Sequence, residues 1–346
     1  MSTVESNVIK PDLSKKDFAS DQMVRWCPGC GDFMILNTMQ KAFAELQLPT
    51  EQIVCVSGIG CSSRLPYYLA TYGIHSIHGR AAATATGVKI SRPDLSVWVV
   101  TGDGDCMAIG GNHFIHAVRK NIDMNIIIFN NKIYGMTKGQ SSPTTPEGTK
   151  TKTTPTGTFE RPFNIGEVTI GAHGTFFARV PDNNPKLLQS VLVEAEKHRG
   201  TSVVEVLQNC VVFTDGIHEQ ITGKETAPES QVVLEHGKPL VYGKEKNKGL
   251  RANGFSFERV KLENNNGKDN TEPLVHDAHT DNPELHLALT RLQLPENPIA
   301  MGVIRNVEAP TFDEQTHKSI EKAQKDSQFK DVSDLFKNSG NTWEIN

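Results

Sequence analysis

Two carboxylates, Asp103 and Asp105, alternate with glycines in the stretch TGDGD, which directly follows the apolar run VWVV. Glycines after a buried parallel strand usually let backbone N–H groups approach a phosphate. A dinucleotide loop of the type G-x-G-x-x-G would need a third glycine, but Met107 stands at that position. The carboxylates also place negative charge where the phosphate would lie. We therefore reject a dinucleotide site.

A divalent cation between the protein and the phosphates removes this conflict of charge. Asp103 can supply a carboxylate oxygen, and Asn130 or Asn131 in the strand end FNN can supply an amide oxygen. Magnesium prefers such oxygen ligands and shares its sites with phosphates. Asp-Gly and Asn-Asn are also common turn formers, but their occurrence at two neighbouring strand ends favours the metal site.

Six cysteines occur in the chain, and the absence of an export signal favours free thiols or metal ligands over disulfides. Cys27 and Cys30 form a C-x-x-C pair around Pro-Gly, a tight knuckle whose sulfurs face one point. This pair alone fits zinc or thiol exchange, although the polar residues before Trp26 argue against a thioredoxin-like strand. The remaining candidates for two further ligands are Cys55, Cys61, Cys106 and Cys210.

The apolar pattern predicts alternating strands and helices that position these residues. Helical spacing is seen over 31–46, 80–90, 107–121 and 185–198. Buried strands are expected over 52–58, 96–101, 125–131, 175–180 and 201–208, where we expect the sheet to end. The unit between 96 and 131 predicts a right-handed crossover, so TGDGD and FNN should lie side by side at the carboxyl edge of a parallel sheet.

The composition divides the chain into three parts. We expect a polar arm over 1–20, an α/β domain over 21–221 and an irregular extension over 222–346 that packs on the core or on a partner. The extension contains weak strands at VVLEH and FSFERVKLE and a helix at PELHLALTRL. Residues 138–164, rich in Thr, Pro, Gly and Lys, form either a disordered excursion or a loop over a site.

Length, composition and charge exclude several classes of protein. With 346 residues, 37% of them hydrophobic, the chain can bury a sizeable core. A net charge of −4 without clustered basic residues argues against nucleic acid. The first residues lack the pattern of a signal or transit peptide, and no apolar run approaches the ~20 residues that span a bilayer. We therefore expect a cytoplasmic protein without a membrane partner.

Eight separated stretches, in order from about Trp26 to Asp215, resemble one family. They are WCPGCGD, SGIGCSSRLPYY, YGIHSIHGRA, VTGDGD, IGGNHFIHAVRKN, FNNKIYGMTKGQ, SSPT and VLQNC. The GDG and NN pairs resemble the cation motif of thiamine diphosphate enzymes, and the whole set resembles the β subunit of 2-oxoacid:ferredoxin oxidoreductases. The resemblance implies an α/β fold, a parallel-sheet domain of the pyrophosphate-binding (PP) type that binds thiamine diphosphate.

The resemblance also implies ligands for two metal centres. For Mg²⁺ these are the Asp103 carboxylate, Asn131 and the backbone carbonyl of Ile133. For a 4Fe–4S cluster they are Cys27, Cys30, Cys61 and Cys210, which leaves Cys55 and Cys106 as packing residues. Zinc is an alternative for the same four thiolates. The oxidation that the family performs favours the cluster, because zinc accepts no electrons.

Contacts to thiamine diphosphate are expected from loops at the same edge. Backbone N–H groups from Gly58 to Ser63 can bind the diphosphate, although an ordinary βα loop is the alternative. The expected set is Gly58, Ile59, Cys61, Ser62, His78, Gly102, Asp103, Gly104, Asp105, Asn131 and Thr137. Asp105 has the alternative of capping the following helix. His75, His78 and Arg80 also have purely structural interpretations.

Lys138 lies just beyond the expected magnesium ligands, where pyruvate-type relatives tend to have glycine. A second cation near the site suits a second carboxylate on the substrate, which favours 2-oxoglutarate over pyruvate or branched-chain 2-oxoacids. The alternative is a solvated lysine in a loop. The resemblance then implies oxidative decarboxylation of 2-oxoglutarate with coenzyme A to succinyl-CoA, CO₂ and reduced ferredoxin, or the reverse carboxylation.

We expect residues 216–346 to be too irregular to form the second α/β unit that thiamine diphosphate enzymes need for the aminopyrimidine ring and the activating glutamate. The resemblance assigns both to a separate α subunit in an α2β2 assembly, so no catalytic residue is assigned to this chain. Two hypotheses of other classes remain. A zinc-stabilised binding subunit without catalysis leaves Asp103 and Asn131 unexplained, and a non-redox thiamine decarboxylase leaves WCPGCGD and QNC unexplained.

Overall fold

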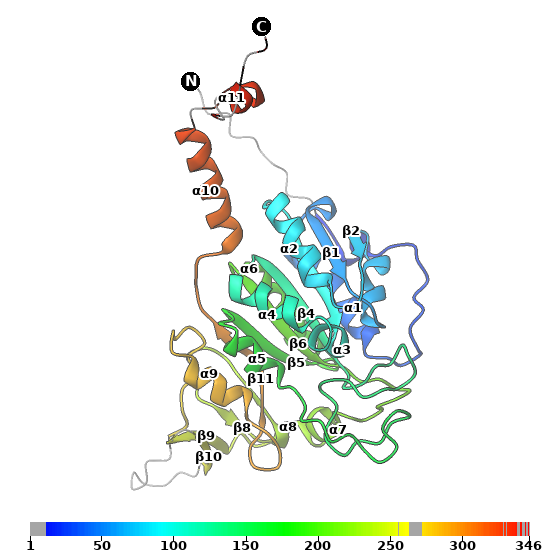
Figure 1. The fold of residues 1–346 in the computed structure, drawn as a ribbon. Coiled ribbons are helices and arrows are strands. Elements are labelled where there is room, and N and C mark those ends of the chain that lie inside the picture. Colours follow the sequence, from blue (N-terminus) through cyan, green and yellow to red (C-terminus); the bar gives the residue numbers. More distant parts are fainter. Residues whose placement is uncertain are drawn as a thin grey trace.

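The structure is a computed structural model and describes residues 12–254, 256–262, 272–327, 329, 331–337, 340, 343 and 345. Its central sheet has the strand order β2-β1-β3-β4-β6-β5-β11-β7 (Figure 1). The strands are β1 (Ile53–Ser57), β2 (Tyr72–His75), β3 (Ser96–Gly102), β4 (Met124–Asn130), β5 (Phe176–Pro181), β6 (Thr201–Leu207), β7 (Gln231–Val233) and β11 (Ile299–Asn306). Every neighbouring pair is parallel except β5 with β11.

Helices flank the sheet, and a smaller antiparallel sheet lies in the C-terminal part. The helices are α1 (Asp32–Leu46), α2 (Ala81–Ser91), α3 (Asp103–Met107), α4 (Gly111–Lys120), α5 (Ile165–Gly171), α6 (Pro185–Lys197), α7 (Glu219–Thr222), α8 (Ala227–Ser230), α9 (Pro283–Thr290), α10 (Phe312–Asp326) and α11 (Val332–Lys337). The smaller sheet contains β8 (Val241–Tyr242), β9 (Lys248–Asn253) and β10 (Ser256–Lys261). Among the described helices none is long and apolar enough to cross a membrane.

The central sheet is buried on both faces, because β1, β4 and β6 are buried along their whole length. One core contains Ala85 of α2 and Phe114 of α4, packed with Ile126 of β4. The other contains Phe43 of α1 and Leu188 of α6, together with apolar residues of β3 and β4. This two-sided burial holds the strand ends in a fixed position relative to one another.

The parallel pairing of β3 and β4 confirms the expected crossover. Gly102 at the end of β3 is in register with Phe129, one residue before the end of β4. Because β1 and β6 are parallel to these strands, the loops after β1, β3, β4 and β6 open at the same edge. TGDGD and FNN therefore lie side by side, as predicted.

The predicted helix over 107–121 is interrupted in the structure. Helix α3 ends at Met107 and α4 begins at Gly111, with Ile109 exposed between them. Gly110 approaches the Asp105 carbonyl so closely that a Cβ would lie 2.4 Å from that oxygen. Gly110 therefore permits the close turn that separates the helices.

The expectation that the sheet ends at 201–208 is wrong. Strand β11 pairs antiparallel with β5, and β7 pairs with β11, so the C-terminal part completes the sheet. The weak strands expected at VVLEH and FSFERVKLE correspond to β7 and β10, and the helix expected at PELHLALTRL corresponds to α9. Phe255 and residues 263–271 lie outside the described residues, as do residues 1–11 of the polar arm. The boundaries at 20 and 221 remain predictions.

Removal of β11 should prevent the chain from folding. A chain that ends after Asn297 loses the strand that covers the outer edge of β5 and the fully buried Met301 and Ile304. An uncovered edge strand promotes aggregation. We expect such a chain to lose most of its soluble yield. A chain that ends after Asp326 keeps β11 and α10, and its yield and melting temperature should match those of the full chain. Equal solubility of both truncations would contradict this role of β11.

Candidate functional site

A cavity of about 210 Å³ lies at the carboxyl edge of the sheet. Every residue predicted to contact thiamine diphosphate lines it except Gly58, and the predicted magnesium ligand Ile133 lines it as well. The other lining residues are Asp32, Gly60, Phe129, Tyr134, Gly135 and Met136. Larger cavities occur, one of them lined by Cys30, Leu207 and Asn209, but the cavity of about 210 Å³ brings together the loops after β1, β2, β3 and β4 that were singled out from the sequence. Whether each of these residues contacts the cofactor remains a prediction.

Asp103 is the buried carboxylate in the first turn of α3. Its Oδ2 accepts hydrogen bonds from Ser142 Oγ at 2.5 Å and from Thr144 Oγ1 at 2.6 Å. Burial raises the pKa of Asp103 to about 6, although these two hydroxyls act in the opposite direction. A cation at this carboxylate would replace the lost hydration and stabilise its charged form.

Asn131 and Ile133 follow β4 in a turn that passes beside Asp103. Asn131 Oδ1 accepts a hydrogen bond from the Ile133 backbone N–H at 3.2 Å. Lys132 between them has a φ of 57°, a left-handed conformation that a residue with a side chain seldom adopts. The Asn131 carbonyl accepts from Thr214 Oγ1 at 2.9 Å, which fixes the turn from the other side. The turn thus places an amide oxygen at the edge where the Asp103 carboxylate lies.

Asp105 joins three loops through its two carboxylate oxygens. Its Oδ1 accepts from the Ile59 N–H at 3.1 Å and the Gly79 N–H at 2.7 Å, and it lies 2.6 Å from His78 Nδ1. Its Oδ2 accepts from Thr101 Oγ1 at 2.6 Å. The carboxylate therefore binds the ends of β1, β2 and β3 rather than the N-terminus of the following helix, and the capping interpretation is wrong.

Gly58 is required by this arrangement. A Cβ at this position would lie 1.9 Å from Asp105 Oδ2. Gly104 is constrained in the same way, because its Cβ would lie 2.2 Å from the Tyr134 ring. Gly58 and Gly104 thus leave room for the side chains of Asp105 and Tyr134 at the cavity wall.

Two hydroxyls of the loop after β1 have no hydrogen-bond partner. Ser62 Oγ and Ser63 Oγ are buried and unpaired, and Ser62 lines the cavity. An unsatisfied buried hydroxyl costs about 1–3 kcal/mol, so such groups usually mark the place of a ligand or water. Hydroxyl and backbone N–H donors around an open cavity fit a diphosphate.

Cys61 and Cys210, two of the four cysteines predicted as cluster ligands, lie close to one another beside this cavity. A Cβ added to Gly135 would lie 3.7 Å from both Cys61 Sγ and Cys210 Sγ, so the two sulfurs flank one open space. Trp26 Nε1 donates a hydrogen bond to the Cys61 carbonyl at 2.7 Å, and the Gly31 N–H donates to the Asn209 carbonyl at 3.3 Å. These bonds connect the C-x-x-C knuckle with the loops that carry Cys61 and Cys210.

Burial and neighbouring groups raise the pKa values of two of these thiols. Burial raises the pKa of Cys61 to about 12, with further contributions from Asp32, Cys210 and Cys27. Burial also raises the pKa of Cys30, followed by the effects of Asp32, Cys210 and Cys61. Thiolates at these positions need a cationic ligand to be stable.

No group of three or more His, Cys, Asp or Glu side chains in the described part of the chain is arranged to hold a metal ion. The choice between a 4Fe–4S cluster and zinc at the four cysteines therefore remains a prediction. Cys55 and Cys106 are fully or almost fully buried in β1 and α3, as expected of packing residues.

Several other candidates lie outside the cavity. Lys138 is exposed, has a φ of 75° and follows Thr137, the last lining residue. The His75 ring packs against Tyr67, and Arg80 Nη1 donates to the carbonyls of Gly79 and Ile109 at 3.3 Å. His75 and Arg80 therefore have structural partners, and the substrate contact of Lys138 remains a prediction.

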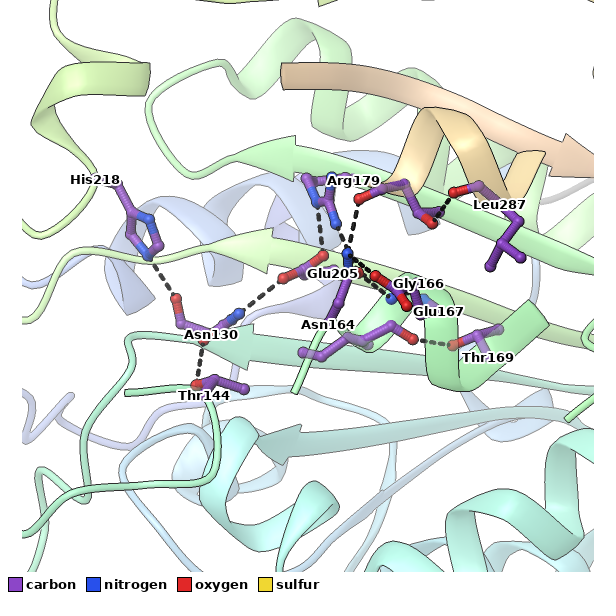
Figure 2. A network of polar contacts seen from close by, with 12 residues as sticks. Asn130, Thr144, Asn164, Gly166, Glu167, Thr169, Arg179, Glu205, His218 and Leu287 are labelled. Atoms are coloured by element: carbon purple, nitrogen blue, oxygen red, sulfur yellow. Dashed lines mark hydrogen bonds and ion pairs between the residues drawn. The ribbon is translucent and has the colours of Figure 1, made fainter. Parts of the chain in front are cut away.

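A buried polar network that was not predicted from the sequence lies beside Asp103. Thr144 Oγ1 reaches Asn130 Oδ1 at 3.0 Å, and Asn130 Nδ2 donates to Glu205 Oε1 at 2.7 Å (Figure 2). Arg179 Nε donates to Glu205 Oε2 at 2.7 Å. Burial would raise the pKa of Glu205, but the Arg179 guanidinium holds it below its usual range. Charged residues inside the apolar strands FFARVP and TSVVEVL were the signal available in the sequence.

Known proteins resemble this chain over most of its length. Residues 53–206 match the family model described as thiamine pyrophosphate enzyme, C-terminal TPP binding domain. The chain is 48% identical over 306 residues to the 2-oxoglutarate oxidoreductase subunit KorB of Mycobacterium tuberculosis, covering 88% of this chain and 81% of that protein. It is 48% identical over 185 residues to the 2-oxoglutarate synthase subunit KorB of Archaeoglobus fulgidus, covering 54% of this chain and 69% of that protein.

A solved structure shares the fold. The 2-oxoglutarate:ferredoxin oxidoreductase from Magnetococcus marinus, with 2-oxoglutarate, coenzyme A and succinyl-CoA bound, has a TM-score of 0.76 and 29% sequence identity. The similarity covers 98% of this chain and 100% of that chain. The match therefore includes the C-terminal part that completes the sheet.

Replacement of Asp105 by asparagine should destabilise the protein. An amide has one acceptor oxygen, so Asp105→Asn leaves buried donors among Ile59 N–H, Gly79 N–H and Thr101 Oγ1 without an acceptor. Each such loss costs about 1–3 kcal/mol, and we expect the free energy of unfolding to fall by about 2–4 kcal/mol in urea titrations. Asp94→Asn, at an exposed Asp94–Arg92 pair, is the control and should change stability by less than about 1 kcal/mol. Equal effects of the two substitutions would contradict the role of Asp105.

Proposed function

This chain belongs to the KorB family of 2-oxoglutarate oxidoreductase subunits with a thiamine pyrophosphate-binding domain, and we propose that it holds thiamine diphosphate, Mg²⁺ and a 4Fe–4S cluster at the carboxyl edge of its sheet. With an α subunit it converts 2-oxoglutarate, coenzyme A and two oxidised ferredoxins to succinyl-CoA, CO₂, a proton and two reduced ferredoxins. The observation that carries the proposal is the cavity lined by Asp103, Asn131 and Cys61, beside which the Cys61 and Cys210 sulfurs flank one open space.

Thiamine diphosphate, when bound, supplies the carbanion chemistry that releases CO₂ from a 2-oxoacid. The residues of this chain hold it in place. Asp103, Asn131 and the Ile133 carbonyl are the proposed ligands of Mg²⁺, and Ser62 with the N–H groups of its loop binds the diphosphate. Ser142 and Thr144 both donate to Oδ2 of Asp103, which fixes the orientation of the carboxylate and leaves Oδ1 for the ion.

The position of Cys61 connects decarboxylation with oxidation. Cys61 lines the cavity and directly precedes Ser62, so a proposed cluster ligand and a proposed diphosphate donor lie on one loop. Electrons that leave the substrate at this cavity therefore have a short path to the four-cysteine site. A non-redox decarboxylase does not require a cluster ligand beside the diphosphate donor. A zinc-stabilised binding subunit does not require the cavity.

Exposed apolar residues on loops near the cavity support the proposal of a partner subunit. Ile77, Ile109 and Met136 are exposed large apolar residues on the loops after β2, α3 and β4. The cavity, at about 210 Å³, is smaller than the ~300–1,000 Å³ of a typical ligand site. We propose that an α subunit in an α2β2 assembly covers these apolar residues and supplies the pyrimidine site and the activating glutamate. The relative from Magnetococcus marinus has 2-oxoglutarate and coenzyme A bound, and the same two substrates are proposed here.

The proposed reaction is tested by anaerobic co-purification of this chain with its α subunit. We expect iron and acid-labile sulfide in the complex, and dye reduction that depends on both 2-oxoglutarate and coenzyme A. Zinc in place of iron would support the binding-subunit alternative. No reduction with any 2-oxoacid would overturn the proposed activity.

Loss of the Thr144 hydroxyl should weaken cofactor binding. Thr144→Val keeps the shape of the side chain but removes a hydrogen bond to the Asp103 carboxylate, an interaction with a charged group worth about 1.5–3 kcal/mol. We expect thiamine diphosphate with Mg²⁺ to bind at least about tenfold more weakly in fluorescence titrations of the cofactor-free complex. Thr153→Val, at an exposed position of the same loop, is the control and should bind as the wild type does. Unchanged binding in Thr144→Val would show that Asp103 needs no support from this loop.

Lys138 is proposed to bind the distal carboxylate of 2-oxoglutarate. It is exposed and directly follows Thr137, which lines the cavity. Lys138→Ala should lower kcat/KM for 2-oxoglutarate by about tenfold or more and leave kcat/KM for pyruvate almost unchanged. Lys152→Ala, also exposed in this loop region, is the control. Unchanged discrimination between the two substrates would remove Lys138 from the substrate site.

A further inference from the structure

Gln208 is a buried polar residue that directly follows β6 and precedes the Cys210 loop. Its side chain is almost fully buried, with 1% relative exposure. Nε2 donates hydrogen bonds to the Asn209 carbonyl at 2.7 Å and to Cys30 Sγ at 3.3 Å. Its backbone N–H donates to the Asn130 carbonyl at 3.1 Å, so the residue is anchored to the end of β4.

The chemistry of its neighbours fixes the orientation of this amide. The Asn209 carbonyl only accepts hydrogen bonds, and a sulfur that ligates a metal also only accepts them. Rotation of the amide by half a turn would bring Oε1 against both acceptors. In the observed orientation Oε1 is buried without a partner, which costs free energy. The amide therefore donates a hydrogen bond to the Cys30 sulfur, while its own Oε1 has no hydrogen-bond partner.

Among the four cysteines of the site, Cys30 accepts a side-chain hydrogen bond through its sulfur. Within the described residues, none of Cys27, Cys61 and Cys210 accepts a hydrogen bond from a side chain through its sulfur. Gln208 therefore acts on one ligand of the set.

We propose that Gln208 raises the reduction potential of the cluster through its N–H···S hydrogen bond to Cys30. This inference rests on the proposed function, because it requires the cluster. Reduction adds one electron to the cluster, breaks no bond to cysteine and needs no proton. The added negative charge is shared by the cysteine sulfurs, so an N–H donor stabilises the reduced form more than the oxidised form. Gln208 is a positioning and tuning residue that makes the cluster a better acceptor of electrons from the cavity.

The test is the midpoint potential of the cluster in the anaerobically purified complex, followed by EPR. Gln208→Met preserves length and volume but removes the donor, and its potential should shift to a more negative value. At the potential where half of the wild-type cluster is reduced, the ratio of reduced to oxidised cluster in Gln208→Met should be about fivefold lower than in the wild type. This is the effect expected of one hydrogen bond. The control is Gln40→Met, which removes a buried amide that donates to the Tyr68 carbonyl, and it should leave the potential unchanged.

An unchanged midpoint in Gln208→Met, with the wild-type content of iron and sulfide, overturns the proposal. A merely structural role would alter cluster content or stability and not the potential of the intact cluster. A second measurement uses the wild-type complex and does not depend on the folding of a variant. With ¹⁵N-labelled glutamine, pulsed EPR of the reduced cluster should show a coupled ¹⁵N nucleus, and Gln208→Met should abolish it. Absence of this coupling in the wild type also overturns the proposal, whereas absence of iron overturns the proposed function itself.

Discussion

The burial of two carboxylates in the first turn of α3 is the constraint on which the rest of the site depends. Asp103 and Asp105 are both almost fully buried, and a buried carboxylate is stable only when it is hydrogen-bonded or paired with a cation. Asp105 meets this requirement within the protein, because both of its oxygens accept hydrogen bonds. Asp103 accepts its side-chain hydrogen bonds on Oδ2 alone. One aspartate therefore holds the loops together, and the other is left with a demand for positive charge, which the proposed Mg²⁺ meets.

The loop over 138–164 is attached to the sheet at both of its ends by the same buried network. Near its start, Thr144 contacts Asp103 and Asn130. At its end, Asn164 caps α5 and accepts from Arg179 Nη2 at 3.4 Å, and Arg179 in turn pairs with Glu205 (Figure 2). A buried ion pair adds little net stability because desolvation opposes it, but its loss leaves an unpaired charge. The network thus favours one specific position of the loop beside Asp103.

More of the site than of the fold could be predicted from the sequence. Local patterns were enough to place TGDGD and FNN at one edge, because a parallel strand–helix–strand unit has a single favoured geometry. They were insufficient for β11, whose pairing with β5 joins residues far apart in the chain and leaves no local signal. Ser142 and Thr144 could not be predicted for a related reason. Hydroxyl groups in a polar loop are expected to be solvated, and only the folded loop brings these two against Asp103. Glu205 and Arg179 did carry a signal, as charges in otherwise apolar strands, but only their adjacency in the sheet identifies them as a pair.

The central claim is that one edge of this sheet holds both the thiamine site and the electron acceptor. Its most direct test is a single-turnover, stopped-flow measurement of the visible absorption of the anaerobic complex after addition of 2-oxoglutarate and coenzyme A, without ferredoxin. The wild type should show bleaching of the cluster absorption, whereas Asp103→Ala should retain its iron and sulfide but show no bleaching, because thiamine diphosphate is no longer held beside Cys61. Equal bleaching in both proteins, or a wild-type complex without cluster absorption, would contradict the account.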